Sequence, residues 1–285
     1  MPKNPKPRIV IFGASGRTGR LLTRAFSEKG HEVVGVGRRE AVLADLPCMP
    51  VILDLEGARH PPGITRPGDI VVNGAHARFT KPIVALCTPK IARLVVLGSM
   101  RYKTRFPDCK AQQVRDAAAV LKEGSLPWVM LHPTMIYGAE GENNVQRMAA
   151  LIRRFHVVPL PLAGRSLIQP VHVDDVVNAV VAAALKPGLN GKTIHLGGPR
   201  AVSYRTFLEA IAKASGTWVR IAPLPLGILK LVALMTRLVP GVPSITGAEV
   251  QRLMEDKNVD IAEMKTKLGI RPRPLARGLE ETFRT

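Results

Sequence analysis

The sequence is poor in cysteine and in aromatic residues, and each shortage argues against a class of protein. Its three cysteines (Cys48, Cys87 and Cys109) are odd in number and show no CxxC spacing, which argues against a disulfide framework and a zinc site and fits a reducing compartment. The seven histidines form no HExxH pair, so we predict no metal. Aromatic residues make up 4% of the 285 residues and interleave no basic run, so a base-stacking platform is not expected.

Acidic residues are also in short supply. The chain has 41 Lys+Arg against 22 Asp+Glu, a formal net charge of +19, which attracts polyanions at low salt. The basic residues are dispersed rather than gathered in one motif: Arg17, Arg20, Arg24, Arg38, Arg39, Arg153, Arg154, Arg271 and Arg273. We therefore favour an anionic protein surface, an anionic membrane surface or a phosphate-rich cofactor as the partner, over nucleic acid.

The first residues carry no apolar h-region, so we predict no secretory signal and expect a cytoplasmic protein. The segment Leu226–Leu238 is strongly apolar but too short and too charged to span a bilayer. Two interpretations stay open for it: a helix on an anionic membrane surface, which would make the protein peripheral to a membrane, or a helix packed on the core or a subunit interface.

Six apolar, β-branched runs alternate with helical patterns in the first half of the chain. Helices are predicted at 17–30, 82–86 and 111–122, from apolar residues at helical spacing. The strands are predicted within 8–12, 31–39, 49–55, 69–75, 92–99 and 126–133. Strands that read as continuous apolar runs between helices are typical of a parallel sheet buried on both faces. We predict an α/β fold, a Rossmann-type doubly wound parallel sheet.

The rhythm changes after Pro133. We predict helices at 145–155, at 171–185 with Asp174 as N-cap, and at 203–216 with Ser203 as N-cap. A strand is expected at 192–198, residues 157–164 as irregular, and the rest as helical. The predicted domains are a nucleotide-binding Rossmann domain of residues 1–137 and 166–199, and a smaller, mainly helical C-terminal lobe of residues 138–165 and 200–285.

The strongest motif is the sequence GASGRTG, which lies directly between the first strand and the first helix. Glycines at this spacing allow a tight turn, the approach of backbone N–H groups to a pyrophosphate, and close packing of helix on strand. The start of the helix adds partial positive charge for an anion. The candidate cofactor-binding residues here are Gly13, Ser15, Gly16, Arg17, Thr18 and Gly19.

The end of the second strand indicates which dinucleotide binds. An NAD site usually has a carboxylate there for the ribose hydroxyls. This strand ends instead in Arg38 and Arg39, which suit a 2′-phosphate, and Arg17 could reach the same group. We therefore favour NADP(H) over NAD(H). Asp54, after the third strand, fits an acceptor for the adenine amine or a turn residue.

These segments together resemble the short-chain dehydrogenase/reductase (SDR) superfamily, in its extended and atypical branches of NmrA-like and complex I NDUFA9-like proteins. The resemblance rests on GASGRTG, ILDL, LGS, CKAQQV, HPTMIYG and QPVHVDDVV, and on the later segments HLGGPRAVSYRTFLEAIAKASG and AEVQRLMEDKNVD. It runs along nearly the whole chain. It implies that Pro133, in HPTMIYG, belongs to the cofactor site.

The resemblance also implies a catalytic set, of which one member is missing. Active relatives use a serine, a tyrosine and a lysine four residues after the tyrosine. Lys110 matches the lysine, which binds the nicotinamide ribose, and Ser99 matches the serine, but the tyrosine position holds Phe106. A phenyl ring cannot act as a general acid or base. Tyr102, in the same loop as Ser99, is our candidate substitute.

Two function hypotheses follow. The first is an NADP(H)-dependent oxidoreductase or epimerase-like enzyme that acts on a small organic substrate without the usual tyrosine. The alternative, implied by the resemblance, is a non-catalytic protein that holds NADP(H), either as a sensor or as an accessory or assembly protein of a respiratory complex. The missing tyrosine favours the second and the retained Lys110 fits both, so the sequence leaves turnover undecided.

Overall fold

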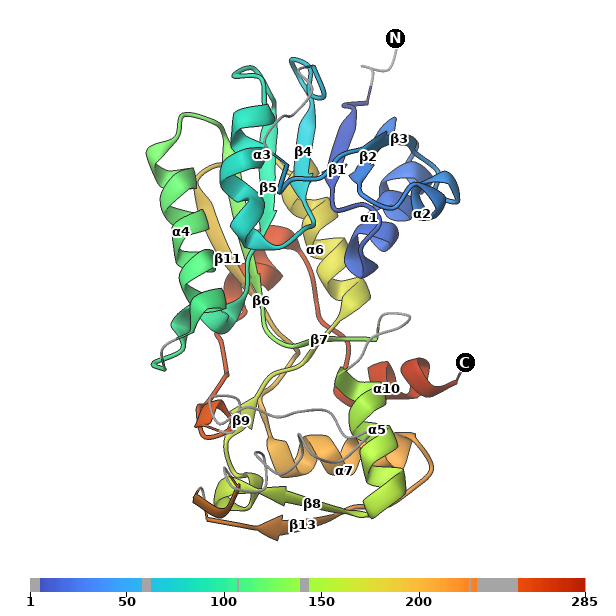
Figure 1. Ribbon diagram of the computed structural model, residues 1–285, viewed down its shortest axis with the longest axis vertical. Helices are drawn as coiled ribbons and strands as arrows, with labels where there is room; N and C mark the ends of the chain where they lie inside the picture. The colour runs from blue at the N-terminus through green and yellow to red at the C-terminus, as the bar shows by residue number, and fades with distance from the viewer. Residues whose placement is uncertain are drawn as a thin grey trace.

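A seven-stranded parallel sheet forms the centre of the larger part of the molecule (Figure 1). The computed structural model describes residues 6–57, 63–106, 108–138, 144–225, 227–229 and 251–284. The strand order is β11-β6-β5-β4-β1-β2-β3. The strands are β1 (Ile9–Phe12), β2 (Val33–Gly37), β3 (Met49–Ile52), β4 (Ile70–Asn73), β5 (Arg93–Leu97), β6 (Trp128–Pro133) and β11 (Lys192–Leu196). Strands β1, β2, β4 and β5 are buried along their whole length, as continuous apolar runs predict.

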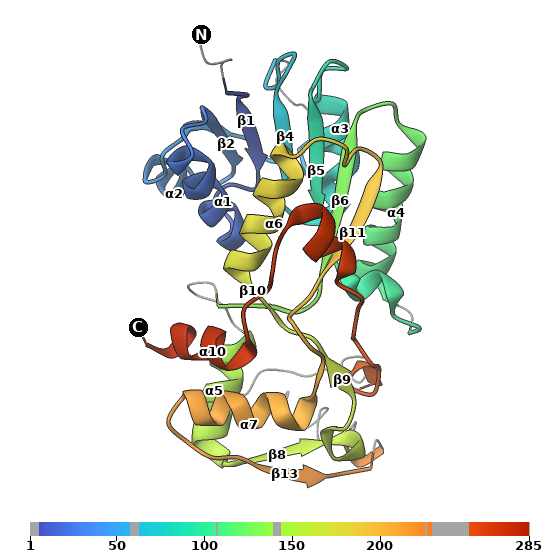
Figure 2. The ribbon, with the colours of Figure 1, turned by 180° about the vertical axis from the view of Figure 1, so that it is seen from behind.

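Helices cover both faces of this sheet (Figure 2). One face packs against α1 (Arg17–Glu28) and α6 (Val173–Leu185), together with α2 (Glu40–Ala44). The other face packs against α3 (Thr80–Leu86) and α4 (Cys109–Glu123). The short 3₁₀ turns η1 (Ala77–Phe79) and η2 (Met100–Lys103) follow β4 and β5 at the edge where the parallel strands end. The predicted doubly wound α/β fold is confirmed.

The remaining elements form a smaller part with its own hydrophobic core. They are α5 (Asn144–Phe155), β8 (Val157–Leu160), the 3₁₀ turn η3 (Pro161–Gly164), α7 (Tyr204–Ala214), β13 (Arg220–Pro223) and α10 (Leu275–Phe283). Two short pairs, β7 (Ile136–Tyr137) with β10 (Val171–His172) and β9 (Leu167–Ile168) with β12 (Val202–Ser203), lie between this part and the sheet. A third cluster of buried side chains, centred on Phe207, joins these elements.

The chain after residue 251 contacts both parts. Ile261, Met264 and Leu268 pack into the core on the α6 side of the sheet, where a π-helical turn η5 (Met264–Leu268) ends at Gly269 in the left-handed conformation. Leu279 of α10 then packs into the core of the smaller part. The predicted domain boundaries stay a prediction.

Three local predictions were wrong. Residues 157–160 form strand β8 instead of an irregular segment, and they pair in parallel with β13, which the prediction of an all-helical remainder missed. The N-cap of α6 is His172, whose Nδ1 accepts the Asp174 N–H at 3.2 Å. Asp174 and Asp175 instead lie in the first turn, where their charge favours the helix dipole.

None of the helices in the described ranges combines the length and the apolar character that a bilayer crossing requires. Most of the apolar segment Leu226–Leu238, with its two predicted interpretations, lies outside the described residues.

Phe207 provides a test of the smaller core. Its side chain is fully buried, so Phe207→Ala should lower the free energy of unfolding by about 3–5 kcal/mol through lost transfer energy and a residual cavity. The matched control is Phe155→Ala, at a 50% exposed position, which should cost less than about 0.5 kcal/mol. Urea unfolding followed by circular dichroism measures both. Equal losses in the two variants would contradict the assignment of Phe207 to the core.

Candidate functional site

The glycine-rich loop leaves β1 in a geometry that side chains would block. Gly13 has φ +82, and a Cβ there would lie 2.7 Å from the Ala75 nitrogen. A Cβ on Gly19 would collide with the carbonyl oxygen of Gly13, so this glycine lets α1 pack against the loop. The N–H groups of Gly13 and Ala14 donate to the Val36 carbonyl at 2.8 and 3.1 Å. These contacts explain why the first and last positions of GASGRTG must be glycine.

Helix α1 begins at this loop without any competing negative charge. Its N-cap, Gly16, has no side chain to accept a hydrogen bond, and the first turn of α1 contains no acidic residue. The positive end of the helix dipole is therefore available to an anion. The loop from Gly13 to Gly19 therefore forms a backbone cradle in which Gly13 and Gly19 leave no room for a Cβ atom. No acidic residue in the first turn of α1 offsets the helix dipole beside this cradle, so the cradle fits a pyrophosphate.

A cleft of about 540 Å³ opens beside the loop. Six of the predicted cofactor residues line it: Gly13, Ser15, Gly16, Arg38, Arg39 and Asp54. Residues after β3 and β4 complete the wall: Leu53, Leu55, Gly74, Ala75, His76, Arg78 and Phe79, together with Val36 and Gly37 of β2. The other predicted site residues do not line this cleft: Arg17, Thr18, Gly19, Ser99, Tyr102, Lys110 and Pro133.

Two arginines and one carboxylate mark the β2–β3 end of the cleft. Arg39 donates from its guanidinium to the Ser15 carbonyl and so ties the end of β2 to the glycine loop. The Arg38 guanidinium lies 4.0 Å from the Asp54 carboxylate, and both side chains are largely exposed. Asp54 also accepts the Glu56 N–H at 3.1 Å, which supports its interpretation as a turn residue without excluding the adenine role.

The opposite wall is built by the turn after β4, which the sequence prediction overlooked. Buried Asn73 accepts the Ala75 N–H at 3.1 Å and donates to Thr80 at 3.2 Å, which fixes this turn. His76 lines the cleft; burial lowers its pKa, and the positive charges of Arg78, Lys110 and Arg101 add to the effect. The position of His76 just past a strand end was the available signal, because ligands of such sheets bind at that edge.

Arg78 reaches across to the loop after β3. Its guanidinium pairs with the Glu56 carboxylate and lies 4.6 Å from the centre of the Phe79 ring. Since Arg78 and Phe79 line the cleft, this pair joins the two loops that form its rim.

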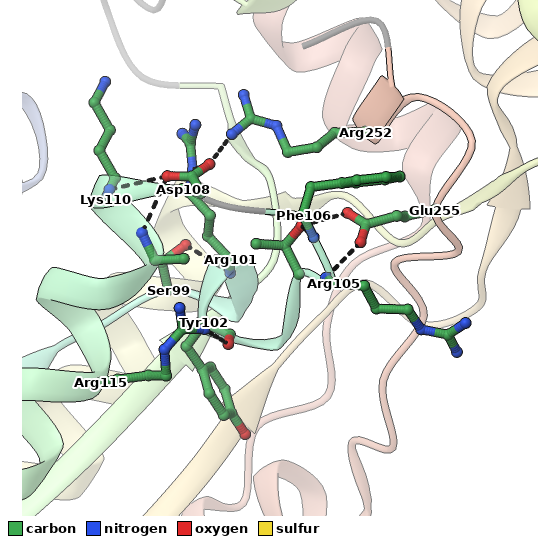
Figure 3. A network of polar contacts seen from close by, with 12 residues as sticks. Ser99, Arg101, Tyr102, Arg105, Phe106, Asp108, Lys110, Arg115, Arg252 and Glu255 are labelled. Atoms are coloured by element: carbon green, nitrogen blue, oxygen red, sulfur yellow. Dashed lines mark hydrogen bonds and ion pairs between the residues drawn. The ribbon is translucent and has the colours of Figure 1, made fainter. Parts of the chain in front are cut away.

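Ser99, Tyr102 and Lys110 do not converge (Figure 3). The Ser99 hydroxyl accepts the Arg101 N–H at 3.2 Å as the cap of η2. The Tyr102 hydroxyl lies 3.0 Å from His195 Nε2, and the Tyr102 ring packs on His132 with 4.4 Å between the ring centres and a tilt of 31°. Burial raises the pKa of Tyr102. Figure 3 shows the side chains of Tyr102 and Lys110 pointing in opposite directions.

Phe106 lies in the loop that precedes α4, because that helix begins at Cys109. Lys110 is in the first turn of the helix. A tyrosine and a lysine four residues apart share a helical face only when both belong to the helix. This local geometry therefore differs from the face-sharing pair that the resemblance implies for active relatives.

A buried carboxylate holds the loop in this position. Asp108 is the N-cap of α4, where it accepts the N–H groups of Lys110 and Ala111 at 2.9 and 3.1 Å. It also pairs with Arg101, at 2.6 Å, and with Arg252 from the far end of the chain. No local pattern in the sequence predicts the pair with Arg252, since 144 residues separate the partners.

Glu255 adds a second link to the same loop. Its carboxylate accepts the Thr104 hydroxyl and the Arg105 N–H, both at 2.7 Å (Figure 3). Asp108 and Glu255 together anchor the loop after β5 to the segment that follows residue 251. Among the described residues, neither Asp108 nor the exposed Cys109 belongs to a group that could hold a metal ion.

The HPTMIYG segment is built into the core. His132 accepts the Ser99 N–H at 3.1 Å and packs so closely on Gly98 that a Cβ there would lie 2.5 Å from its Nδ1. Tyr137 is 1% exposed and its ring meets His172 edge-on at 5.3 Å. Pro133 ends β6, buried beside β11. His132 is thus a packing residue near the end of β6, and Tyr137 packs against His172, the N-cap of α6.

The pH dependence of stability tests the burial of His132. Burial lowers its pKa to about 4, and the charge of His195 adds to the effect, whereas an unfolded histidine titrates near 6.5. The unfolded chain therefore takes up a proton first, so the free energy of unfolding should fall by up to about 3 kcal/mol as pH drops through this window. Urea titrations of the wild type and of His132→Gln measure the slope. An equally steep fall in His132→Gln would contradict this assignment.

Comparison with known proteins gives the same fold and a related family. Residues 91–197 match the model of the NAD dependent epimerase/dehydratase family. The structure of UDP-glucuronic acid 4-epimerase from Bacillus cereus, in complex with UDP-glucuronic acid and NAD, superposes with a TM-score of 0.70 at 16% identity over 97% of this chain and 98% of that one. The structure of gox2253 has a TM-score of 0.73 at 16% identity, over 97% of each chain.

Two relatives found by sequence match this chain over only part of their own length. An uncharacterized protein of Mycobacterium tuberculosis is 26% identical over 210 residues, 72% of this chain but 23% of the relative, so the match spans about a quarter of that protein. The mitochondrial NADH dehydrogenase [ubiquinone] 1 alpha subcomplex subunit 9 of Arabidopsis thaliana is 23% identical over 250 residues, 79% of this chain and 62% of the subunit. The predicted resemblance is confirmed as a similarity: residues 91–197 resemble the NAD dependent epimerase/dehydratase family, the fold is that of the UDP-glucuronic acid 4-epimerase structure, and the chain is distantly similar to subunit 9 of the NADH dehydrogenase alpha subcomplex.

Proposed function

We propose that this chain binds NADP(H) in the cleft beside the glycine loop and holds it without the tyrosine-dependent chemistry of its relatives. The observation that carries the proposal is the lining of the cleft. It places Arg38 and Arg39 directly after β2, beside a backbone cradle suited to a pyrophosphate.

The preference for the 2′-phosphorylated nucleotide follows from charge. A carboxylate at the end of β2 would repel a 2′-phosphate, and none is present before Glu40. The Arg38 guanidinium is 67% exposed, so it can turn toward a phosphate at little cost. The Asp54 carboxylate lies 4.0 Å from the Arg38 guanidinium and offsets part of its positive charge. Asp54 could also accept a hydrogen bond from an adenine amine.

The residues at the opposite end support binding more than turnover. Lys110 lies in the first turn of α4, and α4 packs against η1, whose Arg78 and Phe79 line the β4 end of the cleft, where the family's lysine would meet the nicotinamide ribose. A general acid must also reach hydrogen-bonding distance of the reacting oxygen. The Tyr102 hydroxyl is instead held by His195, on the side of the loop away from Lys110.

Turnover of a small organic substrate, as an oxidoreductase or an epimerase-like enzyme, is the second candidate. Its support is the match to an NAD-dependent epimerase/dehydratase family and the retained Ser99 and Lys110. Hydride transfer needs the cofactor and positioning, and its proton could come from water. The name of the plant relative likewise motivates an accessory role in a respiratory complex, with an anionic protein surface as the partner.

Nucleotide titration tests the binding site. NADPH should bind the wild type more tightly than NADH, and Arg38→Ala should weaken NADPH binding about tenfold while NADH changes little, since one charge-assisted phosphate contact is lost. Nicotinamide fluorescence follows both titrations. Arg66→Ala is the matched control, because this exposed arginine precedes β4 at the opposite edge of the sheet. Failure of both nucleotides to bind would overturn the proposal.

Turnover is tested separately, with enzyme already shown to bind NADPH. We expect no loss of NADPH absorbance with a panel of aldehydes, ketones and sugar nucleotides, because Phe106 occupies the tyrosine position and Tyr102 points away from Lys110. Consumption of a substrate would establish the enzyme hypothesis, and Tyr102→Phe then tests the proton source: a lost rate with intact NADPH binding would assign the proton to Tyr102. An unchanged rate would assign the proton to water or another group.

A further inference from the structure

Exposed apolar side chains gather at the end of the smaller part that lies farthest from the sheet. Phe155 is 50% exposed, Val157 44% and Trp218 61%. Phe155 ends α5, Val157 begins β8, and Trp218 lies two residues before β13. Because Val157 pairs with Arg220 in the register of β8 and β13, these side chains belong to one corner of the molecule.

The corner is held in a fixed shape by local contacts. His156 has φ 52 and turns the chain from α5 into β8, and its ring stacks on Trp218 with 4.6 Å between ring centres. Its carbonyl accepts the Arg220 N–H at 2.7 Å. These contacts fix the turn that holds Phe155 and Trp218 exposed to solvent. Packing of the core does not account for the exposure of these two side chains.

The β8–β13 ribbon continues this corner as an uncovered face. Its inner side chains, Val158, Leu160 and Ile221, pack into the core of the smaller part. The alternate residues on its outer side are Val157, Pro159, Arg220 and Ala222. In Figures 1 and 2 no described element lies beyond the ribbon on that side. We call the set Phe155, Val157, Pro159, Trp218 and Ala222 the ribbon face.

Basic side chains lie around the ribbon face, and the described acidic residue nearest to them in the sequence, Glu209 of α7, pairs with Arg205. Arg153, Arg154, Lys213 and Arg220 are exposed, and none of them has an ion pair within the described part of the chain. Between residues 144 and 208 the sequence contains no acidic residue other than Asp174 and Asp175, and Arg273 pairs with both. The Arg154 guanidinium lies 5.3 Å from the Phe155 ring centre, beside the apolar surface.

We propose that the ribbon face docks on a membrane surface that contains anionic phospholipids. The exposed Trp218 ring, which carries a polar N–H group, is favoured at the boundary between headgroups and acyl chains, and the apolar Phe155 ring can be buried beside it. Long arginine side chains beside them reach the phosphates while their stems stay on the apolar surface. A fluid lipid surface needs only this combination of aromatic anchors and cations.

This site is distinct from nonspecific attraction by the net charge of +19, which needs no apolar contact. It also differs from the sequence-based expectation, which placed membrane contact at Leu226–Leu238. The proposal is independent of NADP(H) binding, because the cleft lies at the sheet and the ribbon face lies at the far end of the smaller part.

The test uses the full chain with vesicles of phosphatidylcholine, with and without phosphatidylserine. Wild type should co-sediment with the phosphatidylserine vesicles, and Phe155→Ser/Trp218→Ser should bind about tenfold more weakly or worse, with unchanged thermal unfolding. Arg154→Ser/Arg220→Ser should also lose at least about tenfold, in a salt-dependent way. The matched control is Met49→Ser/Ile52→Ser, which removes two exposed apolar side chains from β3 and should bind like the wild type.

Trp218 gives a second, local measurement. The chain has two tryptophans, so Trp128→Phe leaves Trp218 as the only tryptophan, whose emission can be excited selectively over that of the tyrosines. Its emission should shift to shorter wavelength and become protected from acrylamide when phosphatidylserine vesicles are added. Sedimentation with no change at Trp218, equal loss in the Met49/Ile52 control, or no vesicle binding at all would overturn the proposal. Self-association of the chain through this face, detected by sedimentation velocity and abolished in Phe155→Ser/Trp218→Ser without vesicle binding, would replace the membrane with a second copy.

Discussion

The arrangement around the candidate site depends on the buried carboxylate of Asp108. A carboxylate that is removed from water must be compensated by charge and by hydrogen bonds. Asp108 meets this requirement with two guanidiniums and two N–H groups at the start of α4. Because one guanidinium, that of Arg252, comes from the other end of the chain, the same interaction fixes the loop after β5 and the segment that follows residue 251. Tyr102 is thereby committed to His195, and Lys110 to the first turn of its helix.

The scarcity of carboxylates links this anchor to the surface of the protein. The chain has 22 acidic residues against 41 basic ones. The buried Asp108 carboxylate pairs with two arginines. Arg273 pairs with the three carboxylates of Asp174, Asp175 and Glu281, which leaves fewer carboxylates for the other arginines. Three arginines of the smaller part, Arg153, Arg154 and Arg220, have no ion pair among the described residues. Arg154 lies beside the aromatic surface of the ribbon face. Arg39, which also has no ion pair in the described part of the chain, lies beside the backbone cradle suited to phosphates.

The sequence predicted what is local and missed what depends on distant partners. β-branched runs gave the sheet, and GASGRTG gave the loop, because strand burial and helix–strand packing act within a few residues. Residues 157–164 read as irregular because Pro159 and Pro161 interrupt an apolar run, yet residues 157–160 form a strand by pairing with β13, some 60 residues later in the sequence. Likewise, no spacing rule connects Tyr102 with His195, and a histidine rather than an aspartate caps α6 because its ring fits beside Gly138.

The order in which the chain contributes its elements has a consequence for biosynthesis. The sheet receives its edge strand β11 only after α5, β8 and α6 have been made, since β11 follows them in the sequence and pairs with β6. The loop from Ser99 to Asp108 is complete long before Arg252 and Glu255 emerge from the ribosome. Until then the Asp108 carboxylate has only Arg101 of its two arginine partners, so the loop is not yet tied to the end of the chain. All residues that line the cleft beside the glycine loop are thus synthesised early, and the residues that anchor the loop after β5 are synthesised late.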